Sequence, residues 1–292
     1  MQIISKQLSP ELKSKYAVLC QTLRNMGQVV VGFSGGVDST LVLKVARDVL
    51  GDSVVAVIGD SEAFPQGEVD AALALARSLG VEVVCVRTHE LANPHFAVNT
   101  PDRCYHCKNE LFGMLRQVAN ERGIAWVVDG SHAEDGRAGD HRPGLRAAAE
   151  QGVRSPLREA GLTKSEIRAL ARCLGLPNWD KPSFACLSSR FPYGTRITPE
   201  LLARLDRCEQ VLRDLGFRQC RVRHHDTVAR IEVEPGDLEQ VLQHRQTILK
   251  HFREAGYAYV ALDLEGYRSG KMNDTLKERD APVIPSDQIG AR

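Results

Sequence analysis

The sequence predicts an α/β fold with a parallel central sheet, followed by a smaller α+β domain. Short apolar runs alternate with segments of helical spacing, as in strand-helix-strand units. The runs are continuously apolar, which is typical of parallel strands buried on both faces. The alternation changes near Pro182. We therefore expect domains at residues 1–181 and 182–272, with a flexible tail at 273–292.

The elements of the first domain follow from local signals. Gln28–Phe33 is a β-branched run that predicts a buried first strand. Gly80 and Gly123 are helix stop signals, and Thr163 with Glu166 has the spacing of a capping box. We expect strands at 28–33, 53–59, 81–87 and 125–129, and helices at 9–26, 39–50, 65–79, 109–122 and 164–174.

The second domain has a different order of elements. We expect a helix at 199–215, strands at 219–223 and 228–233, a long helix at 236–255 and a strand at 257–264. Helix-strand-strand-helix-strand is the order of a small α+β domain. The tail has little apolar content, which favours disorder.

Composition limits the possible functions. The 292 residues are 43% hydrophobic and carry 38 Lys and Arg against 37 Asp and Glu, so no global basic field favours nucleic acid. No long apolar run indicates a membrane helix, and Met1–Lys15 lacks the pattern of a signal peptide. We expect a cytoplasmic protein without a membrane partner, whose eight cysteines are not a disulfide framework.

A glycine-rich turn joins the first strand to the next helix. Paired glycines let backbone N–H groups approach an anion, and the helix N-terminus adds the positive end of its dipole. Two serines offer hydroxyl donors, and Asp38 is a candidate Mg²⁺ ligand. Asp129, which ends a strand, is a second candidate for orienting Mg²⁺ or ATP, next to Gly130. The alternative is an ordinary capped strand-helix turn. The turn consists of Ser34, Gly35, Gly36, Val37, Asp38 and Ser39.

This turn resembles the PP-loop of the ATP-pyrophosphatases, a superfamily that includes GMP and NAD synthetases. It is not a Walker A loop, because no Gly-Lys-Ser/Thr follows. The resemblance implies that ATP is cleaved to AMP and pyrophosphate, leaving an adenylated substrate. By analogy of fold, it also places Asp60 and Ser61 near the adenosine.

Three cysteines lie in segments that we expect at the carboxyl edge of the sheet. Cys104 and Cys107 have the spacing of a metal-ligand pair, and Cys186 lies at the expected domain junction. The pair alone is half of a zinc site, or two inert thiols. With Cys186 it is a three-thiolate site for an iron-sulfur cluster. Cys186 alone is a candidate nucleophile activated by Arg190.

The other cysteines follow apolar patterns, and we expect them to be structural. They are Cys20, Cys85, Cys173, Cys208 and Cys220.

Several motifs together resemble the LarE family, ATP-dependent sulfur transferases of nickel-pincer nucleotide synthesis. The similarity covers roughly residues 10 to 272, and Ala185-Cys186-Leu187 is more specific than the phosphate loop. The motifs are the loop 34–39 and the segments 103–108, 129–131, 182–190, 229–233 and 264–268.

The resemblance implies a reaction. ATP adenylates a carboxylate of pyridinium-3,5-biscarboxylic acid mononucleotide, pyrophosphate leaves, and sulfur displaces AMP to give a thiocarboxylate. Some members sacrifice one cysteine that matches Cys186. Others hold a 4Fe-4S cluster on three cysteines and deliver bound sulfide. Because this chain has Cys104 and Cys107 as well, it matches the cluster type, with a sulfide donor and a homo-oligomeric assembly expected.

Arginines follow Cys186 in the sequence, and their forked guanidinium groups suit the phosphate and carboxylates of a nucleotide substrate. The alternative is a solvated basic face. Glu232 and Glu234 share one strand face and either bind a metal or face water. The candidate substrate ligands are Arg190, Arg196, Arg221, Arg223 and Arg230.

Three other functions are compatible with a PP-loop. A tRNA 2-thiolation enzyme shares the loop and often three cysteines, but near-neutral charge and the lack of a recognisable RNA-binding module count against it. An amide-forming synthetase would need no cysteine. A non-catalytic nucleotide sensor would not need three thiols at the ligand edge.

Overall fold

The computed structural model describes residues 8–136, 142–182, 185–268 and 270–274. The chain forms two compact units, and each is built from two segments. The N-terminal unit comprises Met1–Ser188 and Tyr193–Ala203, and the C-terminal unit comprises Ser189–Pro192 and Arg204–Arg292. The division therefore runs through a helix and falls later than the boundary expected at 182. The expected tail lies outside the described residues from 275 onward.

The sheet of the N-terminal unit is parallel, as predicted. Its strands are β1 (Val29–Gly32), β2 (Val54–Asp60), β3 (Glu82–Arg87) and β4 (Trp126–Val128), in the order β3-β2-β1-β4. Successive strands are added on one side of β1 and β4 is added on the other. Ligands of such sheets bind where the order reverses, at the carboxyl ends of the strands. Here that point lies between β1 and β4.

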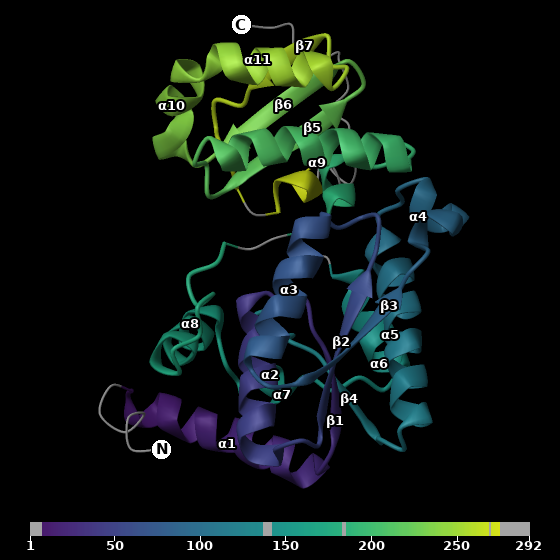
Figure 1. Cartoon of the computed structure of the whole chain (residues 1–292), viewed down its shortest axis with the longest axis vertical. Helices are drawn as coiled ribbons and strands as arrows, with labels where there is room; N and C mark the ends of the chain where they lie inside the picture. Colours follow the sequence, from purple (N-terminus) through teal and green to yellow (C-terminus); the bar gives the residue numbers. More distant parts are fainter. Residues whose placement is uncertain (1–7, 137–141, 183–184, 269, 275–292) are drawn as a thin grey trace, which may run out of the picture. The chain divides into compact units, whose positions relative to one another are not determined.

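Helices cover both faces of this sheet, as Figure 1 shows. One apolar core joins α1, α2, α3, α7 and α8 to one face, and a second core joins α5 and α6 to the other. Burial on both faces explains why the strands are continuously apolar. The helices are α1 (Pro10–Met26), α2 (Val37–Leu50), α3 (Gln66–Ser78), α4 (Pro94–Ala97), α5 (Arg103–Glu121), α6 (Pro143–Glu150), α7 (Pro156–Glu159) and α8 (Lys164–Cys173).

Two features of this unit differ from the sequence prediction. Helix α5 begins at Arg103 rather than at 109, so it includes the cysteine pair. Its N-cap, Asp102, makes no side-chain capping hydrogen bond. The short helices α4, α6 and α7 and the 3-10 turn Glu90–Ala92 were not predicted. The capping box of Thr163 and Glu166 on α8 is confirmed.

The C-terminal unit has the predicted order of elements. Helix α9 (Pro199–Asp214) leads into β5 (Cys220–His225), β6 (Val228–Val233) and β7 (Tyr259–Leu262). Strand β6 pairs antiparallel with β5 and parallel with β7. The expected long helix is wrong: His244 separates α10 (Leu238–Gln243) from α11 (Arg245–Glu254). None of the helices in the described ranges has the length and apolar character needed to cross a bilayer.

Candidate active site

The phosphate loop is held by hydrogen bonds among its own hydroxyls. The backbone N–H of Ser34 donates to Oγ of Ser39 at 3.3 Å, and the two Oγ atoms lie 3.2 Å apart. Oγ of Ser39 reaches the carbonyl of Gly36 at 3.2 Å. Gly36 is the N-cap of α2 and offers no side chain to cap the helix. The first N–H groups of α2 are therefore not capped by that residue, as an anion site at a helix N-terminus requires.

Gly35 must be a glycine for two reasons. Its φ of 69° lies in the left-handed region, which disfavours side chains. A Cβ built on it would lie 2.9 Å from Cβ of Ala72 on α3. The amide of Asn178 also donates to the carbonyl of Gly35 at 3.0 Å and to Oγ1 of Thr40 at 2.9 Å. The loop is therefore clamped between α3 and a segment far along the chain.

The end of β4 reaches the same loop. A Cβ on Gly130 would lie 2.8 Å from the backbone nitrogen of Ser39, so the two backbones are in direct contact. The carboxylate of Asp129 accepts hydrogen bonds from Oγ of Ser131 at 2.6 Å and from Oγ of Ser155 at 2.7 Å. Asp129 thus orients hydroxyl groups in this structure. The predicted nucleotide residues after β1 and after β4 are brought together.

Asp38 has a partner that the sequence did not indicate. The ammonium group of Lys164, at the start of α8, donates to both carboxylate oxygens at 2.6 and 2.5 Å. The side chains are 25% and 28% exposed. The pair and Asn178 were missed because no local pattern joins residues so far apart in sequence.

Asp60 and Ser61 lie at the end of β2 and line a pocket of about 190 Å³, together with Glu62, Phe64 and Arg87. Contact of Asp60 and Ser61 with adenosine stays a prediction. Ser61 has a structural role as well, because its hydroxyl donates to Glu90 at 2.8 Å and accepts from the backbone N–H of Ala63 at 3.0 Å.

The three candidate cysteines gather in the N-terminal unit. Cys104 and Cys107 lie one turn apart at the start of α5, and Cys186 comes just before the turn Leu187–Arg190. Cys104 is an exposed residue, but desolvation of its thiol raises its pKa, and the nearby Cys186 raises it further. Burial raises the pKa of Cys107 well above its usual value, with contributions from Glu90, Cys186 and Cys104. The electrostatic influence of Cys186 therefore reaches both thiols of the pair.

A chain of hydrogen bonds connects the cysteines to the sheet edge. The backbone N–H of Leu187, next to Cys186, donates to the carbonyl of Ala63 at 2.8 Å. The backbone N–H of Ala63 donates to Oγ of Ser61, and this hydroxyl donates to Oε2 of Glu90. Oε1 of Glu90 accepts from Sγ of Cys107 at 3.4 Å. Glu90 is only 4% exposed. Sequence reasoning missed it, because a single glutamate in a loop gives no signal.

Arg103 fixes the start of α5. Its side chain is 2% exposed, and Nη1 donates to Oδ1 of Asn99 and, at 3.0 Å, to the carbonyl of Ser188. Ser188 follows Cys186 by two residues. Arg103 therefore ties the segment of Cys186 to the helix that carries Cys104 and Cys107.

The donor chemistry of these thiols fits an iron-sulfur cluster. In the part of the chain that the structure describes, no three or more His, Cys, Asp or Glu side chains are arranged to hold one ion. The zinc interpretation of Cys104 and Cys107 therefore gains no support. The thiolates of an iron-sulfur cluster bind different irons and stand farther apart than the ligands of one ion. Three neighbouring thiols are the donor chemistry that such a cluster takes.

The remaining cysteines differ in burial. Cys20, Cys208 and Cys220 are buried as expected, and Cys173 is half-buried. Cys85 is exposed, so its expected place in a core is wrong. It lies on β3, the edge strand of the sheet, where one side lacks a neighbouring strand.

The arginines of the C-terminal unit are engaged in ion pairs. Arg190 is fully buried, and two of its guanidinium nitrogens donate to the carboxylate of Glu209 at 2.8 Å. This pairing gives Arg190 a structural role that the sequence did not predict, and its role in the reaction stays a prediction. Arg196, in the N-terminal unit, is exposed.

Glu232 organises the next arginines. Its side chain is fully buried, which corrects the expectation that it faces water or a metal. It accepts from Arg223 at 2.8 and 3.0 Å and from Arg230 at 3.2 Å. Arg230 also pairs with Asp263 at 3.1 Å. Arg221 stacks over the ring of Tyr267 at 5.1 Å. A role of these arginines in binding substrate stays a prediction.

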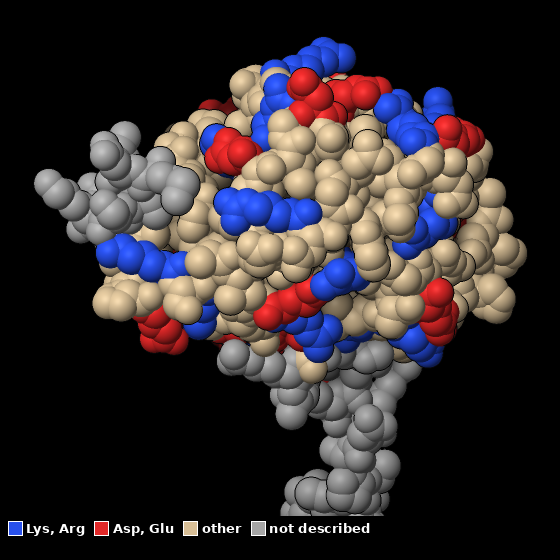
Figure 2. All heavy atoms as spheres, turned by 90° about the horizontal axis from the view of Figure 1, so that it is seen from below, with Lys and Arg blue, Asp and Glu red and all other residues tan. Residues whose placement is uncertain are grey.

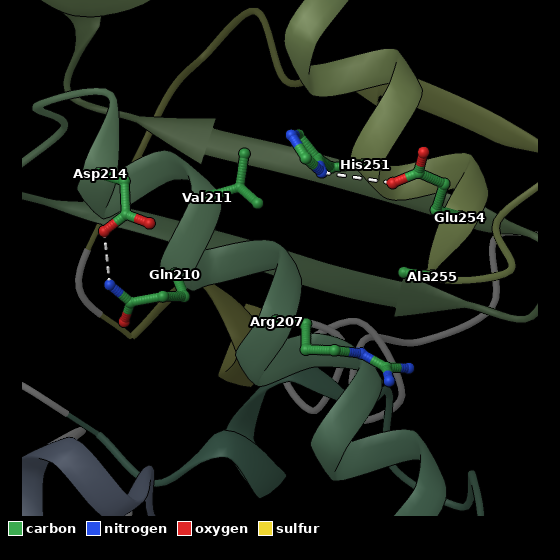
Figure 3. A pocket seen from close by; sticks show the side chains of 7 residues that line it. All are labelled: Arg207, Gln210, Val211, Asp214, His251, Glu254 and Ala255. Carbon is green, nitrogen blue, oxygen red and sulfur yellow. Dashed lines mark hydrogen bonds and ion pairs between the residues drawn. The ribbon is translucent and has the colours of Figure 1, made fainter.

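Two surface features give no competing site. A pocket of about 410 Å³ lies between α9 and α11 (Figure 3), but its side chains form only local pairs, Gln210 with Asp214 and His251 with Glu254. On the face drawn in Figure 2, basic and acidic side chains of the described residues are interspersed. That face offers no continuous basic surface for a nucleic acid.

Comparison with known proteins agrees with this geometry. The NAD synthase family matches residues 13–110, which contain the phosphate loop. A pyridinium-3,5-bisthiocarboxylic acid mononucleotide synthase of Lactiplantibacillus plantarum is 44% identical over 91% of this chain and 96% of its own length. An uncharacterized protein of Synechocystis is 45% identical over 91% of this chain and 99% of its length.

A more distant similarity is confined to part of the chain. A glutamine-hydrolyzing GMP synthase of Coxiella burnetii is 29% identical over 51% of this chain and 32% of its own length. The two extensive similarities cover both units, and the synthase among them carries the name of the product that the sequence motifs implied. The chain therefore belongs to the LarE family of ATP-dependent sulfur transferases.

Proposed function

We propose that this chain replaces a carboxylate oxygen of pyridinium-3,5-biscarboxylic acid mononucleotide with sulfur, at the expense of ATP. One observation carries the proposal: three thiols and a phosphate loop occupy the carboxyl edge of the same sheet, within one unit. The loop suits activation of an oxygen by ATP, and the thiols suit delivery of sulfur.

The first step is adenylation. A carboxylate oxygen of the substrate attacks the α-phosphorus of ATP, and pyrophosphate leaves with the electrons of the broken P–O bond. The N–H groups at the start of α2 and the hydroxyls of Ser34 and Ser39 bind the departing phosphates. Asp38 and Asp129 would hold Mg²⁺ there. Adenylation is needed because AMP is a far better leaving group than a carboxylate oxygen.

The second step replaces AMP with sulfur. A sulfur nucleophile attacks the activated carbonyl carbon, AMP leaves, and a thiocarboxylate remains. We propose that Cys104, Cys107 and Cys186 hold a 4Fe-4S cluster, whose fourth iron would carry exogenous sulfide for this attack. Arg103 and Glu90 fix the segments on which these thiols lie.

The alternative sulfur source is Cys186 itself. Its Sγ would form a thioester as AMP leaves. Removal of the Cα proton would then break the Cβ–Sγ bond, so that sulfur stays on the product and dehydroalanine stays in the chain. This route consumes the protein in one turnover, and it gives no role to the neighbouring pair of thiols.

Replacing Cys186 with alanine tests the function directly. We expect thiocarboxylate formation, measured by mass spectrometry with anaerobically prepared protein, ATP and sulfide, to fall at least about a hundredfold. Cys85→Ser is the matched control, because Cys85 is exposed and lies on β3. It should retain wild-type activity. Thiocarboxylate formation by Cys186→Ala at the wild-type rate would contradict a role of Cys186 in sulfur delivery.

Iron and sulfide analysis of the same preparation separates the two sulfur sources. The cluster predicts bound iron that is lost in Cys104→Ser and Cys107→Ser, together with repeated turnover when sulfide is supplied. An iron-free chain whose mass decreases by one hydrogen sulfide after a single turnover would show the sacrificial route instead.

The family resemblance adds three proposals about context. The donor is sulfide supplied from outside the chain, the assembly is a homo-oligomer, and the compartment is the cytoplasm. Analytical ultracentrifugation of the purified protein tests the assembly, and a single sedimenting species of monomer mass would contradict it.

A further inference from the structure

The phosphate loop contains no cation of its own. Its six residues, 34–39, include one acidic side chain, Asp38, and no lysine or arginine. A Walker A loop carries a lysine that contacts the phosphates, and this loop lacks that residue. A triphosphate bears several negative charges, so a cation from elsewhere in the fold is expected to join the loop when the nucleotide binds.

Lys164 brings a cation to this place. Its ammonium nitrogen lies 2.5 and 2.6 Å from the two carboxylate oxygens of Asp38, within the loop. It comes from α8, whose side chains pack in the same apolar core as those of α2. Its own backbone N–H is fixed by Oε2 of Glu134 at 2.7 Å. The flexible side chain is therefore attached to a well-anchored backbone.

The position of Lys164 in its helix is unfavourable without a further role. It is the first residue of α8, and a cation there faces the positive end of the helix dipole. The capping box explains Thr163 and Glu166 but not the lysine between them. Because both partners are partly exposed, the ion pair with Asp38 contributes little to stability. A residue that breaks a local rule without a compensating gain is expected at functional sites.

We propose that Lys164 is a ligand of the nucleotide phosphates and that Asp38 holds it in place until ATP binds. Lys164 then exchanges the Asp38 carboxylate for phosphate oxygens, and Asp38 becomes available for Mg²⁺. Lys164 and Asp38 thus pair with each other before ATP binds. Afterwards Lys164 pairs with the phosphates and Asp38 with Mg²⁺. This inference rests on the use of ATP in the proposed function and deepens it.

Binding of a non-hydrolysable nucleotide tests the role of Lys164. Calorimetry of the full chain with α,β-methylene-ATP and Mg²⁺ should show at least a tenfold loss of affinity in Lys164→Met, about 1.4 kcal/mol. Adenosine, which has no phosphate, should bind this variant as it binds the wild type. Lys164→Arg should recover part of the affinity for the analogue.

Lys15→Met is the matched control. Lys15 pairs with Glu166 on the same helix at 2.8 Å, and those side chains are 24% and 22% exposed, close to the values of the other pair. This variant should bind both ligands within twofold of wild type. Three results would overturn the proposal: unchanged analogue binding by Lys164→Met, an equal loss in Lys15→Met, or an equal loss of adenosine.

The test is independent of sulfur chemistry, because it uses neither the pyridinium substrate nor the thiols. If the chain forms no thiocarboxylate but Lys164→Met still loses the analogue selectively, the proposed function fails and this inference stands. If sulfur is inserted normally and Lys164→Met binds the analogue as wild type does, the proposed function stands and this inference fails. If the wild type does not bind the analogue, both fail.

Discussion

Two ion pairs, one in each unit, place their charges in opposite environments. In the N-terminal unit, Asp38 and Lys164 are each about a quarter exposed and lie at a loop built to meet an anion. In the C-terminal unit, Arg190 and Glu209 are fully buried and satisfied by each other. The first arrangement leaves charges available for a ligand, whereas the second uses them inside the fold.

Complete pairing makes the buried arrangement possible. Removing ions from water is unfavourable unless attraction and hydrogen bonds compensate. Glu209 accepts from Arg190 twice and from the backbone N–H of Val222 at 3.0 Å. Burial acts to raise the pKa of Glu209, but Arg190, Arg221 and the backbone N–H of Val222 together lower it overall. The buried ion pair is therefore stable because each charge has a matched partner. Removing one partner should strongly destabilise the unit.

The largest effect is expected from Glu209→Gln, which keeps the shape but leaves Arg190 as an uncompensated buried charge. We expect the free energy of unfolding of the C-terminal unit to fall by about 3 to 5 kcal/mol. Hydrogen exchange of peptides from β5 and β6 measures this loss. Both tryptophans, Trp126 and Trp179, belong to the N-terminal unit, so fluorescence in the same urea series follows that unit separately.

The exposed pair Lys44–Asp48, with side chains 27% and 36% exposed, supplies the control. Asp48→Asn should change stability by less than about 0.5 kcal/mol. If Glu209→Gln were no more harmful than this control, the contrast between the two units would be wrong.

The second effect concerns the loop. Gly35→Ala should lower the affinity for α,β-methylene-ATP at least tenfold, about 1.4 kcal/mol, because a side chain at φ 69° is strained and meets Ala72. Gly27→Ala is the control: Gly27 has a similar φ of 72°, but nothing lies within 4 Å of its Cβ position. It should lower stability by about 1 kcal/mol and leave nucleotide affinity unchanged. If both variants bound α,β-methylene-ATP with equal affinity, the proposal that nucleotide binding depends on the clamped conformation of the loop would be wrong.

The smallest effect is a pH dependence of the C-terminal unit. His224 is 4% exposed and lies 3.0 Å from the hydroxyl of Tyr257. Burial lowers its pKa, Arg204 and His225 add to the shift, and Asp226 opposes it. The unfolded chain therefore takes up a proton at a higher pH than the folded chain does. Stability should be full above about pH 6.5 and decline below it.

The decline should not exceed about 1.4 kcal/mol per pH unit for one group. It can be followed by hydrogen exchange of β5 between mildly acidic and neutral pH. His224→Gln should flatten the dependence, whereas His251→Gln, at an exposed position, should keep it. A steep dependence that survives His224→Gln would assign the effect to another group.

Local patterns predicted most of the N-terminal unit. Continuous apolar runs identified its four strands, and the spacing of Thr163 and Glu166 identified the start of α8. The phosphate loop was predictable because two glycines, two serines and the preceding strand are adjacent in the sequence. Cys186 was grouped with Cys104 and Cys107 because all three were expected at the carboxyl edge of the sheet, and the family resemblance then supported this grouping.

Features that depend on distant partners were not predictable. Lys164 and Asp38 are separated by most of the unit's sequence. The position of Glu90 in the site depends on its hydrogen bonds with Ser61 and Cys107, which the sequence does not indicate. Burial of Glu232 contradicted the expectation from strand alternation, because Arg223 and Arg230 supply its partners.

Gly130 and Ser39 bring two stretches of main chain together at the base of the loop. A side-chain carbon added to Gly130 would lie 2.8 Å from the backbone nitrogen of Ser39, so no side chain separates the segment after β4 from the start of α2. The floor of the nucleotide cradle is thus made of peptide groups, whose shape and dipoles do not depend on residue identity. The surrounding side chains can therefore change without altering this floor, provided that the glycine is retained.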